Sequence, residues 1–183
     1  MDRSLIYPDH IPELFELRSR LVAQMSEQLG SDLGTIIAYS EIARVTSVDD
    51  ASSDGPDFVY GSNLQHALVV SRAANDGASG SGGIILVTYS VPNAHHVSGT
   101  PFFMEPPLPE SLEAAQSEFQ TCSAEGIRID VLMIALRVDG RRSMALQTCF
   151  RPMAEAAGGI AVLVLPDSPL EPIVQRILQS NGK

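Results

Sequence analysis

The eight residues 129–136, IDVLMIAL, carry the clearest strand signal in the sequence. The run is short, rich in apolar residues, and without alternation of polar and apolar positions. A strand that is covered on both faces has this pattern, because neither face meets water. Three further stretches share it: residues 33–39 (LGTIIAY), 84–88 (IILVT) and 160–165 (IAVLVL). The sequence therefore predicts four buried strands.

Amphipathic helical patterns lie before and between these stretches. Apolar residues recur at about 3.6-residue spacing from Ile11 to Met25, and Gly30 follows as a stop signal. Similar patterns cover residues 63–74, 109–124, 143–157 and 169–178, with Gly126 and Gly158 beyond the second and third of these. Alternating strands and helices predict parallel strands joined by right-handed crossovers. We expect an α/β fold with a doubly wound, mostly parallel sheet and helices on both faces.

Length and composition limit the kinds of partner and compartment. The 183 residues fit a single domain spanning residues 1–183, and the formal net charge of −10 would repel the phosphates of nucleic acid. The sequence shows neither a signal peptide nor an apolar run of about 18 residues that could cross a membrane. Cys122 and Cys149 are too few for a disulfide framework. We expect a cytoplasmic protein that binds neither nucleic acid nor membranes.

No enzyme motif is complete. Residues 77–83 (GASGSGG) precede a strand instead of a helix and lack the ending of a phosphate-binding loop, so we interpret them as a linker. The adjacent His95 and His96 have no zinc-site spacing to His66 or His10, and Ser90 lacks the flanking glycines of a hydrolase nucleophile. We expect a protein that is not an enzyme.

Function is expected at one edge of the sheet. Ligands of doubly wound sheets bind beyond the carboxyl ends of the strands, here after Tyr39, Thr88 and Leu136. Residues 49–61 and 90–109 show no regular pattern, and loops of such length are often functional.

Three short motifs resemble a known family. DRSLI at residues 2–6, GSNLQHAL at 61–68 and TYSVPNAH at 88–95 resemble, in the same order, motifs of bacterial von Willebrand factor A domains, particularly those that accompany MoxR-class AAA+ ATPases. The family motifs are DxSxS, a GTN-like segment that opens a helix, and a strand ending in TDGxPTAH. The likeness continues through residues 101–134 and covers the chain from Asp2 to about Leu178. The resemblance implies a Rossmann-like von Willebrand factor A fold.

The resemblance also implies a divalent metal site, but with losses. In the family, serine and threonine hydroxyls bind the cation, and aspartates act largely through water. By position Asp2, Ser4 and Ser62 keep oxygen-bearing side chains, whereas Ile6 replaces a serine and Tyr89 replaces an aspartate. We expect Mg2+ or Mn2+ to bind weakly or not at all. The alternative role for Asp2 and Ser62 is to cap helix starts.

The first central strand of the family has no counterpart in the sequence. In the family an apolar strand precedes DxSxS, whereas only Met1 precedes Asp2 here. Either the natural start lies upstream, or the fold lacks this strand. In the second case the strands at residues 33–39 and 84–88 must close the gap or leave unpaired edges.

The expected function is protein binding. By resemblance the partner is a MoxR-class AAA+ ATPase or its client, and His95, Phe102 and Phe103 lie in a proline-rich loop suited to partner contact. The alternative role for the phenylalanines is to anchor the loop to the core. Two other functions stay open: a metal-dependent hydrolase using Asp2, Ser62 and the histidines, and a truncated relative without independent activity.

Overall fold

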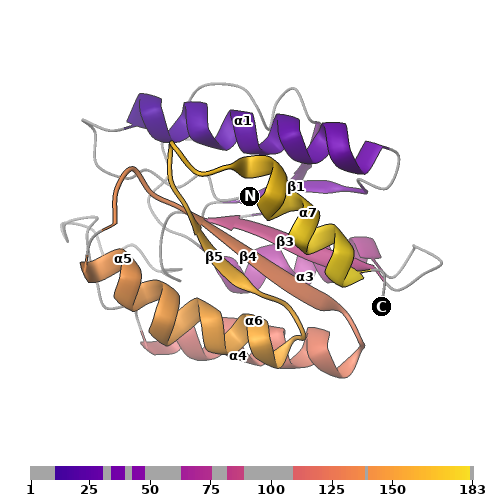
Figure 1. Ribbon diagram of the computed structural model, residues 1–183. Helices are drawn as coiled ribbons and strands as arrows, with labels where there is room; N and C mark the ends of the chain where they lie inside the picture. The colour runs from indigo at the N-terminus through magenta and orange to yellow at the C-terminus, as the bar shows by residue number, and fades with distance from the viewer. Residues whose placement is uncertain are drawn as a thin grey trace.

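Strands and helices alternate along the chain. The computed structural model describes residues 11–30, 34–39, 43–47, 63–75, 82–88, 109–138 and 140–181. The elements (Figure 1) are α1 (Ile11–Leu29), β1 (Ile36–Tyr39), β2 (Ala43–Thr46), α3 (Leu64–Asn75), β3 (Gly83–Thr88), α4 (Pro109–Ala124), β4 (Arg128–Ile134), α5 (Gly140–Ala145), the π-helix η3 (Leu146–Phe150), α6 (Arg151–Ala156), β5 (Ala161–Val164) and α7 (Leu170–Asn181).

Three parallel strands form the main sheet, in the order β3-β4-β5. Gly83 pairs with Arg128 at the start of β3 and β4, and Val131 pairs with Ala161 at the start of β5. The central strand, β4, is buried from Ile129 to Ile134. The prediction of parallel strands at residues 84–88, 129–136 and 160–165 is confirmed, with ends shifted by one or two residues. The predicted burial holds for β4, whereas β3 is buried from Leu86 to Thr88 and β5 at Val164.

Helices cover both faces of this sheet, as the sequence predicts. On one face, Leu132 and Ile134 of β4 pack in a cluster that α1 and α7 complete. On the other, Val131 and Met133 pack in a second cluster whose helical members come from α3, α4, α5, η3 and α6. Successive residues of β4 from Val131 to Ile134 enter the two clusters alternately, so each of these four positions is apolar.

The strand predicted at residues 33–39 forms, but its predicted place in the parallel sheet is wrong. β1 pairs antiparallel with β2 in a separate two-stranded sheet, and it does not pair with β3. Three residues separate the two strands in the sequence, which suffices for a hairpin but not for a parallel crossover. Helix α3 contacts both strands of the hairpin and also β3, so it bridges the two sheets.

Glycines end three helices. Gly30, Gly126 and Gly158 have φ angles of 52°, 75° and 72°, in the left-handed region that favours glycine. The prediction that these residues stop α1, α4 and α6 is confirmed.

The helix predicted at residues 143–157 contains an irregular turn. It begins at Gly140 and widens into the π-helical turn η3, where the backbone N–H of Arg151 donates to the carbonyl oxygen of Leu146. Leu146, Cys149 and Phe150 of this turn are buried. The wider turn is consistent with the extra residue that a π-helical segment adds to a helix.

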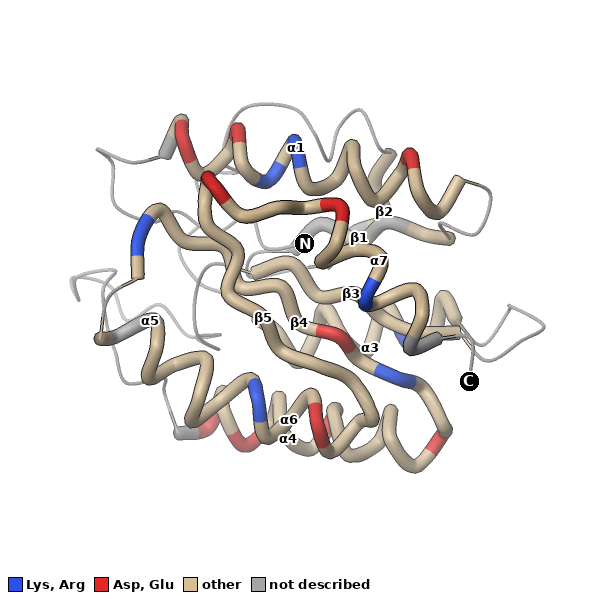
Figure 2. Tube along the Cα trace, viewed as in Figure 1, with Lys and Arg blue, Asp and Glu red and all other residues tan. Residues whose placement is uncertain are grey.

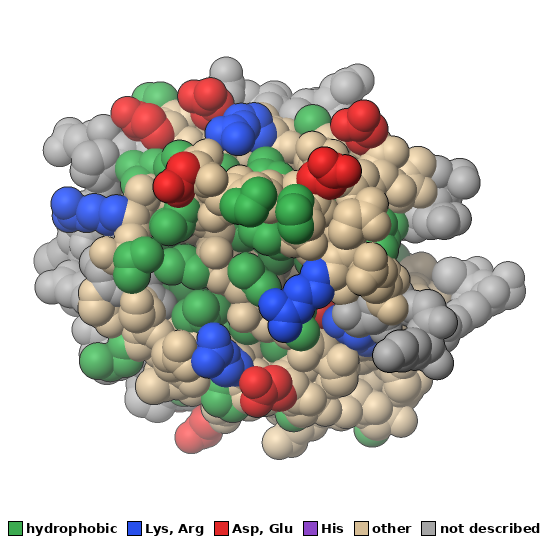
Figure 3. All heavy atoms as spheres, in the orientation of Figure 1, with side chains coloured by type: hydrophobic (Ala, Val, Ile, Leu, Met, Phe, Trp, Pro, Cys, Tyr) green, Lys and Arg blue, Asp and Glu red, His purple; other side chains and the backbone are tan. Residues whose placement is uncertain are grey.

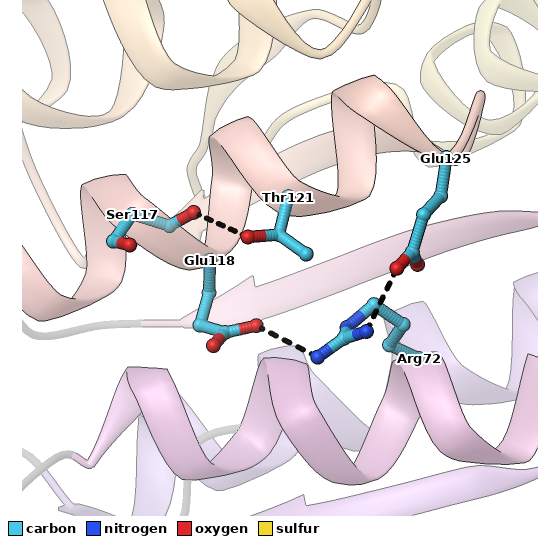
Figure 4. A network of polar contacts seen from close by, with 5 residues as sticks. All are labelled: Arg72, Ser117, Glu118, Thr121 and Glu125. Atoms are coloured by element: carbon cyan, nitrogen blue, oxygen red, sulfur yellow. Dashed lines mark hydrogen bonds and ion pairs between the residues drawn. The ribbon is translucent and has the colours of Figure 1, made fainter.

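Helices α3 and α4 are joined by ionic contacts as well as apolar packing. Arg72 of α3 reaches Glu125 of α4, with Nη1 and Oε1 2.8 Å apart, and Glu118, with Nη2 and Oε2 3.6 Å apart (Figure 4). On the same helix the hydroxyl of Thr121 donates to the carbonyl oxygen of Ser117. The contacts of Arg72 hold α3 and α4 together on one face of the sheet.

Candidate functional site

The candidate site is the edge of the sheet where the three parallel strands end. β3, β4 and β5 end at Thr88, Ile134 and Val164, and parallel strands place these ends together. The helices that precede the strands run back across the sheet, so α3 begins at this edge (Figure 1). This is the position at which doubly wound sheets bind ligands.

The start of α3 is fixed by an asparagine cap. The side-chain oxygen Oδ1 of Asn63 accepts a hydrogen bond from the backbone N–H of His66 at 3.0 Å. The Asn63 carbonyl oxygen accepts the Ala67 N–H at 3.1 Å. This is the geometry of an N-cap residue, which satisfies a free N–H of the first turn. Leu64 and Leu68 of the same segment are buried and hold the helix against the core.

The segment after β5 is tied to its neighbours. The backbone N–H of Leu165 donates to the Ser168 hydroxyl at 2.8 Å, and the Arg20 guanidinium of α1 donates to the Pro166 carbonyl at 3.2 Å. After β4, the Ala135 N–H donates to the Val164 carbonyl oxygen at 2.9 Å. These bonds give this part of the edge a fixed backbone.

The segment after β4 carries exposed side chains. Arg137 is exposed, Val138 is 62% exposed, and Met144 on α5 is 65% exposed. Arg141 and Arg142 lie between them in the sequence, at the start of α5. This feature was not predicted from the sequence. Its signal was the run RVDGRR at residues 137–142, which holds three of the 12 basic residues of an acidic chain.

The site residues predicted from the sequence belong to segments that the structure does not describe. The two expected losses in the metal motif, Ile6 and Tyr89, lie outside the described residues. So do the predicted metal and partner-binding residues: Asp2, Ser4, Ser62, His95, Phe102 and Phe103. All of these assignments stay predictions.

The described segments hold neither a metal-binding cluster nor a membrane-spanning helix. Across the described ranges, no three His, Cys, Asp or Glu side chains group closely enough to hold a metal ion. No helix in the same part of the chain has the length and apolar character needed to span a membrane.

Both cysteines are free and buried. Cys122 of α4 is 0% exposed, and Cys149 of η3 is 4% exposed. Burial, assisted by the nearby carboxylate of Glu118, raises the pKa of the Cys122 thiol to about 11. A buried protonated thiol is a poor nucleophile, so Cys122 is a core residue.

Solved structures show where this arrangement occurs. The conserved hypothetical protein BatB from Bacteroides thetaiotaomicron is 18% identical, with 100% of this chain and 96% of that chain covered and a TM-score of 0.58. The SpRpn10 VWA domain is 16% identical, with 96% and 90% covered and a TM-score of 0.61. Proximal thread matrix protein 1 from the mussel byssus is 14% identical, with 97% of this chain but only 43% of that chain covered and a TM-score of 0.62. Likeness at such low identity shows the fold alone.

Sequence comparison gives the family. No curated protein matches the sequence. One family model does, described as "Rv0959-like protein, vWA domain", and it matches residues 21–136, which is more than half of the chain. The matched region runs from the middle of α1 to just past the end of β4. The chain therefore belongs to the Rv0959-like family of von Willebrand factor A domains.

Proposed function

We propose that this domain is a non-enzymatic protein-binding module that holds its partner with the loops at the carboxyl edge of the sheet. The observation that carries the proposal is the family match over residues 21–136, on a fold that brings three strand ends and the capped start of α3 to one edge. A fixed backbone beneath the loops suits recognition, because little conformational entropy is lost when the partner binds.

The proposed partner is a MoxR-class AAA+ ATPase or a client of that ATPase, in the cytoplasm. The three motifs quoted above support the partner class through their resemblance to domains that accompany such ATPases. The formal net charge of −10 favours a basic surface on the partner and binding that weakens as salt is added.

The proposed module works with a weakened or absent metal site. The donor set does not fit a tightly held cation, since Mg2+ prefers about six oxygen ligands and charge neutralisation. Asp2 is the one carboxylate in the motifs DRSLI and TYSVPNAH. The Ile6 side chain has no oxygen, and Tyr89 stands where the family has an aspartate. Nothing in the proposed binding function therefore depends on a metal.

Direct binding to a purified MoxR-class ATPase from the same genome tests the proposal. Biolayer interferometry should give a saturable, salt-sensitive signal with the wild-type domain. The variant Phe102→Ala/Phe103→Ala should weaken binding at least about tenfold, because aromatic anchors often carry much of an interface. Arg176→Ala, an exposed position on α7, is the matched control and should bind like wild type.

Thermal melts of each variant separate the two roles of the phenylalanines. A large loss of melting temperature would assign Phe102 and Phe103 to the core. No measurable binding of the wild-type domain to the ATPase or to its client proteins would contradict the proposed function. Turnover of a panel of esters or phosphoesters by the metal-loaded wild type would favour the hydrolase instead.

A further inference from the structure

Strand β5 is an outer strand of the main sheet, and its free edge is partly exposed. The order β3-β4-β5 leaves β5 paired on one side only, with β4. In Figure 1, β5 runs in front of β4, with α7 on one side and α6 on the other. Its first three residues, Ala161, Val162 and Leu163, are apolar but only partly buried. Figure 3, in the same orientation, shows hydrophobic side chains gathered over this part of the molecule.

This edge carries none of the features that usually protect an outer strand. The sequence of β5, AVLV, contains no charged residue and no proline, and Figure 2 shows the strand without acidic or basic positions. Charged side chains, prolines or bulges commonly protect outer strands, because an open edge attracts other strands. Strand β2, the outer strand of the hairpin, has Arg44. The composition of β5 therefore favours pairing with a further strand.

The hydrogen bonds to β4 identify the residues of β5 that face outward. The carbonyl oxygens of Ile160 and Val164 accept hydrogen bonds from backbone N–H groups of β4 and of the first residue after it, at 2.7 and 2.9 Å. Alternate residues of a strand direct their backbone groups to opposite sides. Val162 therefore also faces β4, whereas the backbone groups of Ala161 and Leu163 point away from it.

The open part of the edge is bounded at both ends. Before it, the N–H of Gly159 donates to a carbonyl oxygen of α6 at 2.8 Å. After it, the N–H of Leu165 donates to the Ser168 hydroxyl at 2.8 Å, and the Leu165 carbonyl oxygen accepts the Ser168 N–H at 3.0 Å. Within the described segments, no hydrogen bond reaches the outward N–H and C=O groups of Ala161 and Leu163. The open edge thus consists of these two residues.

We propose that β5 pairs antiparallel with β5 of a second copy of this chain. With Val162 opposite its own counterpart, Ala161 of each copy lies opposite Leu163 of the other. Two residues that face each other in such a hydrogen-bonded pair exchange both of their N–H···O bonds. This register therefore pairs every outward N–H and C=O group of Ala161 and Leu163 in both copies.

The spacing of the open groups favours a second copy as the occupant. A two-fold axis at Val162 makes the edge complementary to itself, and two-fold dimers are the commonest closed oligomers. The two Val162 side chains would form a close pair of β-branched residues, which stabilises strand pairing. This lateral edge is separate from the carboxyl edge of the proposed function, so either proposal can fail without the other.

Sedimentation equilibrium of the full chain tests the proposal. The mass of the wild type should rise from 19.6 kDa towards twice that value between about 10 µM and about 1 mM protein. Each copy carries a net charge of −10, so added salt screens the repulsion between copies. We expect the association constant to rise several-fold between about 50 and 300 mM salt. Binding to a basic partner should weaken over the same range, which distinguishes the two interactions.

A matched pair of variants tests the backbone contact. Ala161→Pro removes one outward N–H and leaves the bonds to β4 in place, and proline is tolerated at the first residue of an outer strand. It should raise the dissociation constant of the dimer at least about tenfold. Ala161→Ser keeps the N–H at the same position and should dimerise like wild type.

Amide hydrogen exchange of the wild type, followed by NMR, gives a test that holds even if the proline variant does not fold. The amides of Ala161 and Leu163 should exchange at least about tenfold more slowly in concentrated than in dilute protein. Those of Val162 and Val164, which face β4, should exchange slowly in both and serve as internal controls.

Four results would overturn the proposal. They are a wild type that stays monomeric at every concentration, a folded Ala161→Pro variant that dimerises as tightly as wild type, and a dimer that leaves the exchange of Ala161 and Leu163 unchanged. The fourth is protection of these two amides by an added apolar peptide in a protein that stays monomeric, since the edge would then bind a different partner.

Discussion

The buried carboxylate of Asp130 accepts a hydrogen bond from the backbone N–H of Ile160, with 2.9 Å between Oδ1 and N. Asp130 is 1% exposed and lies near the start of β4, whereas Ile160 directly precedes β5. Arg128 completes the arrangement with two charge-assisted bonds, from Nε to Oδ2 at 2.8 Å and from Nη2 to Oδ1 at 2.6 Å. The carboxylate therefore sets the approach of β5 to β4 at the edge opposite the candidate site.

Asp130→Ala should lower the free energy of unfolding by about 2–4 kcal/mol. The change removes the acceptor for Ile160 and takes the Asp130 carboxylate away from the largely buried Arg128. Asp130→Asn keeps an oxygen for Ile160 and should fall between Ala and wild type. Urea denaturation measures all three. Asp167→Ala, on the exposed turn after β5, is the control and should change stability by about 0.5 kcal/mol or less. A similar loss for Asp130→Ala and this control would contradict the structural role.

Gly159→Ala should destabilise the domain through steric conflict. A Cβ atom at position 159 would collide with the carbonyl oxygen of Ile129, a backbone atom of the central strand that cannot move aside as a side chain can. Overpacking of this kind costs about 1–3 kcal/mol, seen as a lower urea midpoint. Gly34→Ala meets nothing within 4 Å and should be neutral or slightly stabilising. If both variants unfold at the wild-type midpoint, the close approach of Gly159 to β4 is wrong.

Local sequence pattern predicted most elements of this fold, but it did not predict every pairing. The apolar runs at residues 84–88, 129–136 and 160–165 identified the parallel strands, because a strand that helices cover on both faces is apolar at most of its positions. The run at residues 33–39 has the same apolar character, yet β1 pairs with β2. Predicting this pairing requires two facts: that the connection after β1 is short, and that residues 43–46 form a strand. The second is hard to see in the sequence, because β2 has only four residues and one of them is an arginine.

The sequence predicts where the candidate site lies better than it predicts which residues form it. Parallel strand order alone places the ends at Thr88, Ile134 and Val164 on one edge. The exposed residues that follow β4 were not predicted, because residues 137–142 (RVDGRR) contain no spaced ligand motif. Exposure of Val138 and Met144 is a tertiary property, since both residues would be equally compatible with a core.

The thiol of Cys122 should resist modification in the folded protein. Burial raises its pKa to about 11, so at pH 8 only about a thousandth is thiolate, the form that reacts with alkylating reagents. In a Cys149→Ala background, iodoacetamide should modify Cys122 at least about 100-fold faster in urea than in buffer. Rapid modification of the native protein would contradict the buried position.

The same pKa predicts how stability changes at high pH. Because the folded state holds the Cys122 proton more tightly than the unfolded state, the contribution to stability is complete below the ordinary thiol pKa and is lost as the pH rises towards 11. Wild type should therefore lose more stability than Cys122→Ala between pH 8 and pH 11, when each is compared with its own value at pH 8. Urea midpoints at matched pH values give the two slopes, and parallel slopes would count against the raised pKa.

The contacts of Arg72 with Glu118 and Glu125 should contribute little to stability. The Arg72 side chain is 26% exposed and that of Glu125 is 39% exposed, so water and salt screen their attraction. We expect Arg72→Gln to lower the melting temperature by about 2 °C or less in low salt and by even less in about 0.5 M NaCl. A drop above about 5 °C that persists at high salt would show that the side chain packs between α3 and α4 in a way that charge does not explain.

Divalent metal should bind weakly or not at all to the wild-type domain. Ile6 and Tyr89 remove a hydroxyl ligand and a carboxylate from the family pattern, so Asp2, Ser4 and Ser62 are left to hold a cation that prefers about six oxygens. Calorimetric titration with Mg2+ and with Mn2+ should give no saturable heat below about 1 mM.

The substitution set Ile6→Ser/Tyr89→Asp/Ser90→Gly restores the family residues and should raise metal affinity at least about tenfold, because it returns one ligand and one negative charge to the site. Adding Ser62→Ala to this set should cancel the gain if Ser62 is a ligand, whereas Ser71→Ala, at a half-buried position within α3, should leave it unchanged. A micromolar dissociation constant for the wild type that Ser62→Ala abolishes would mean that the site is functional as it stands, with ligands from residues that the family pattern does not include.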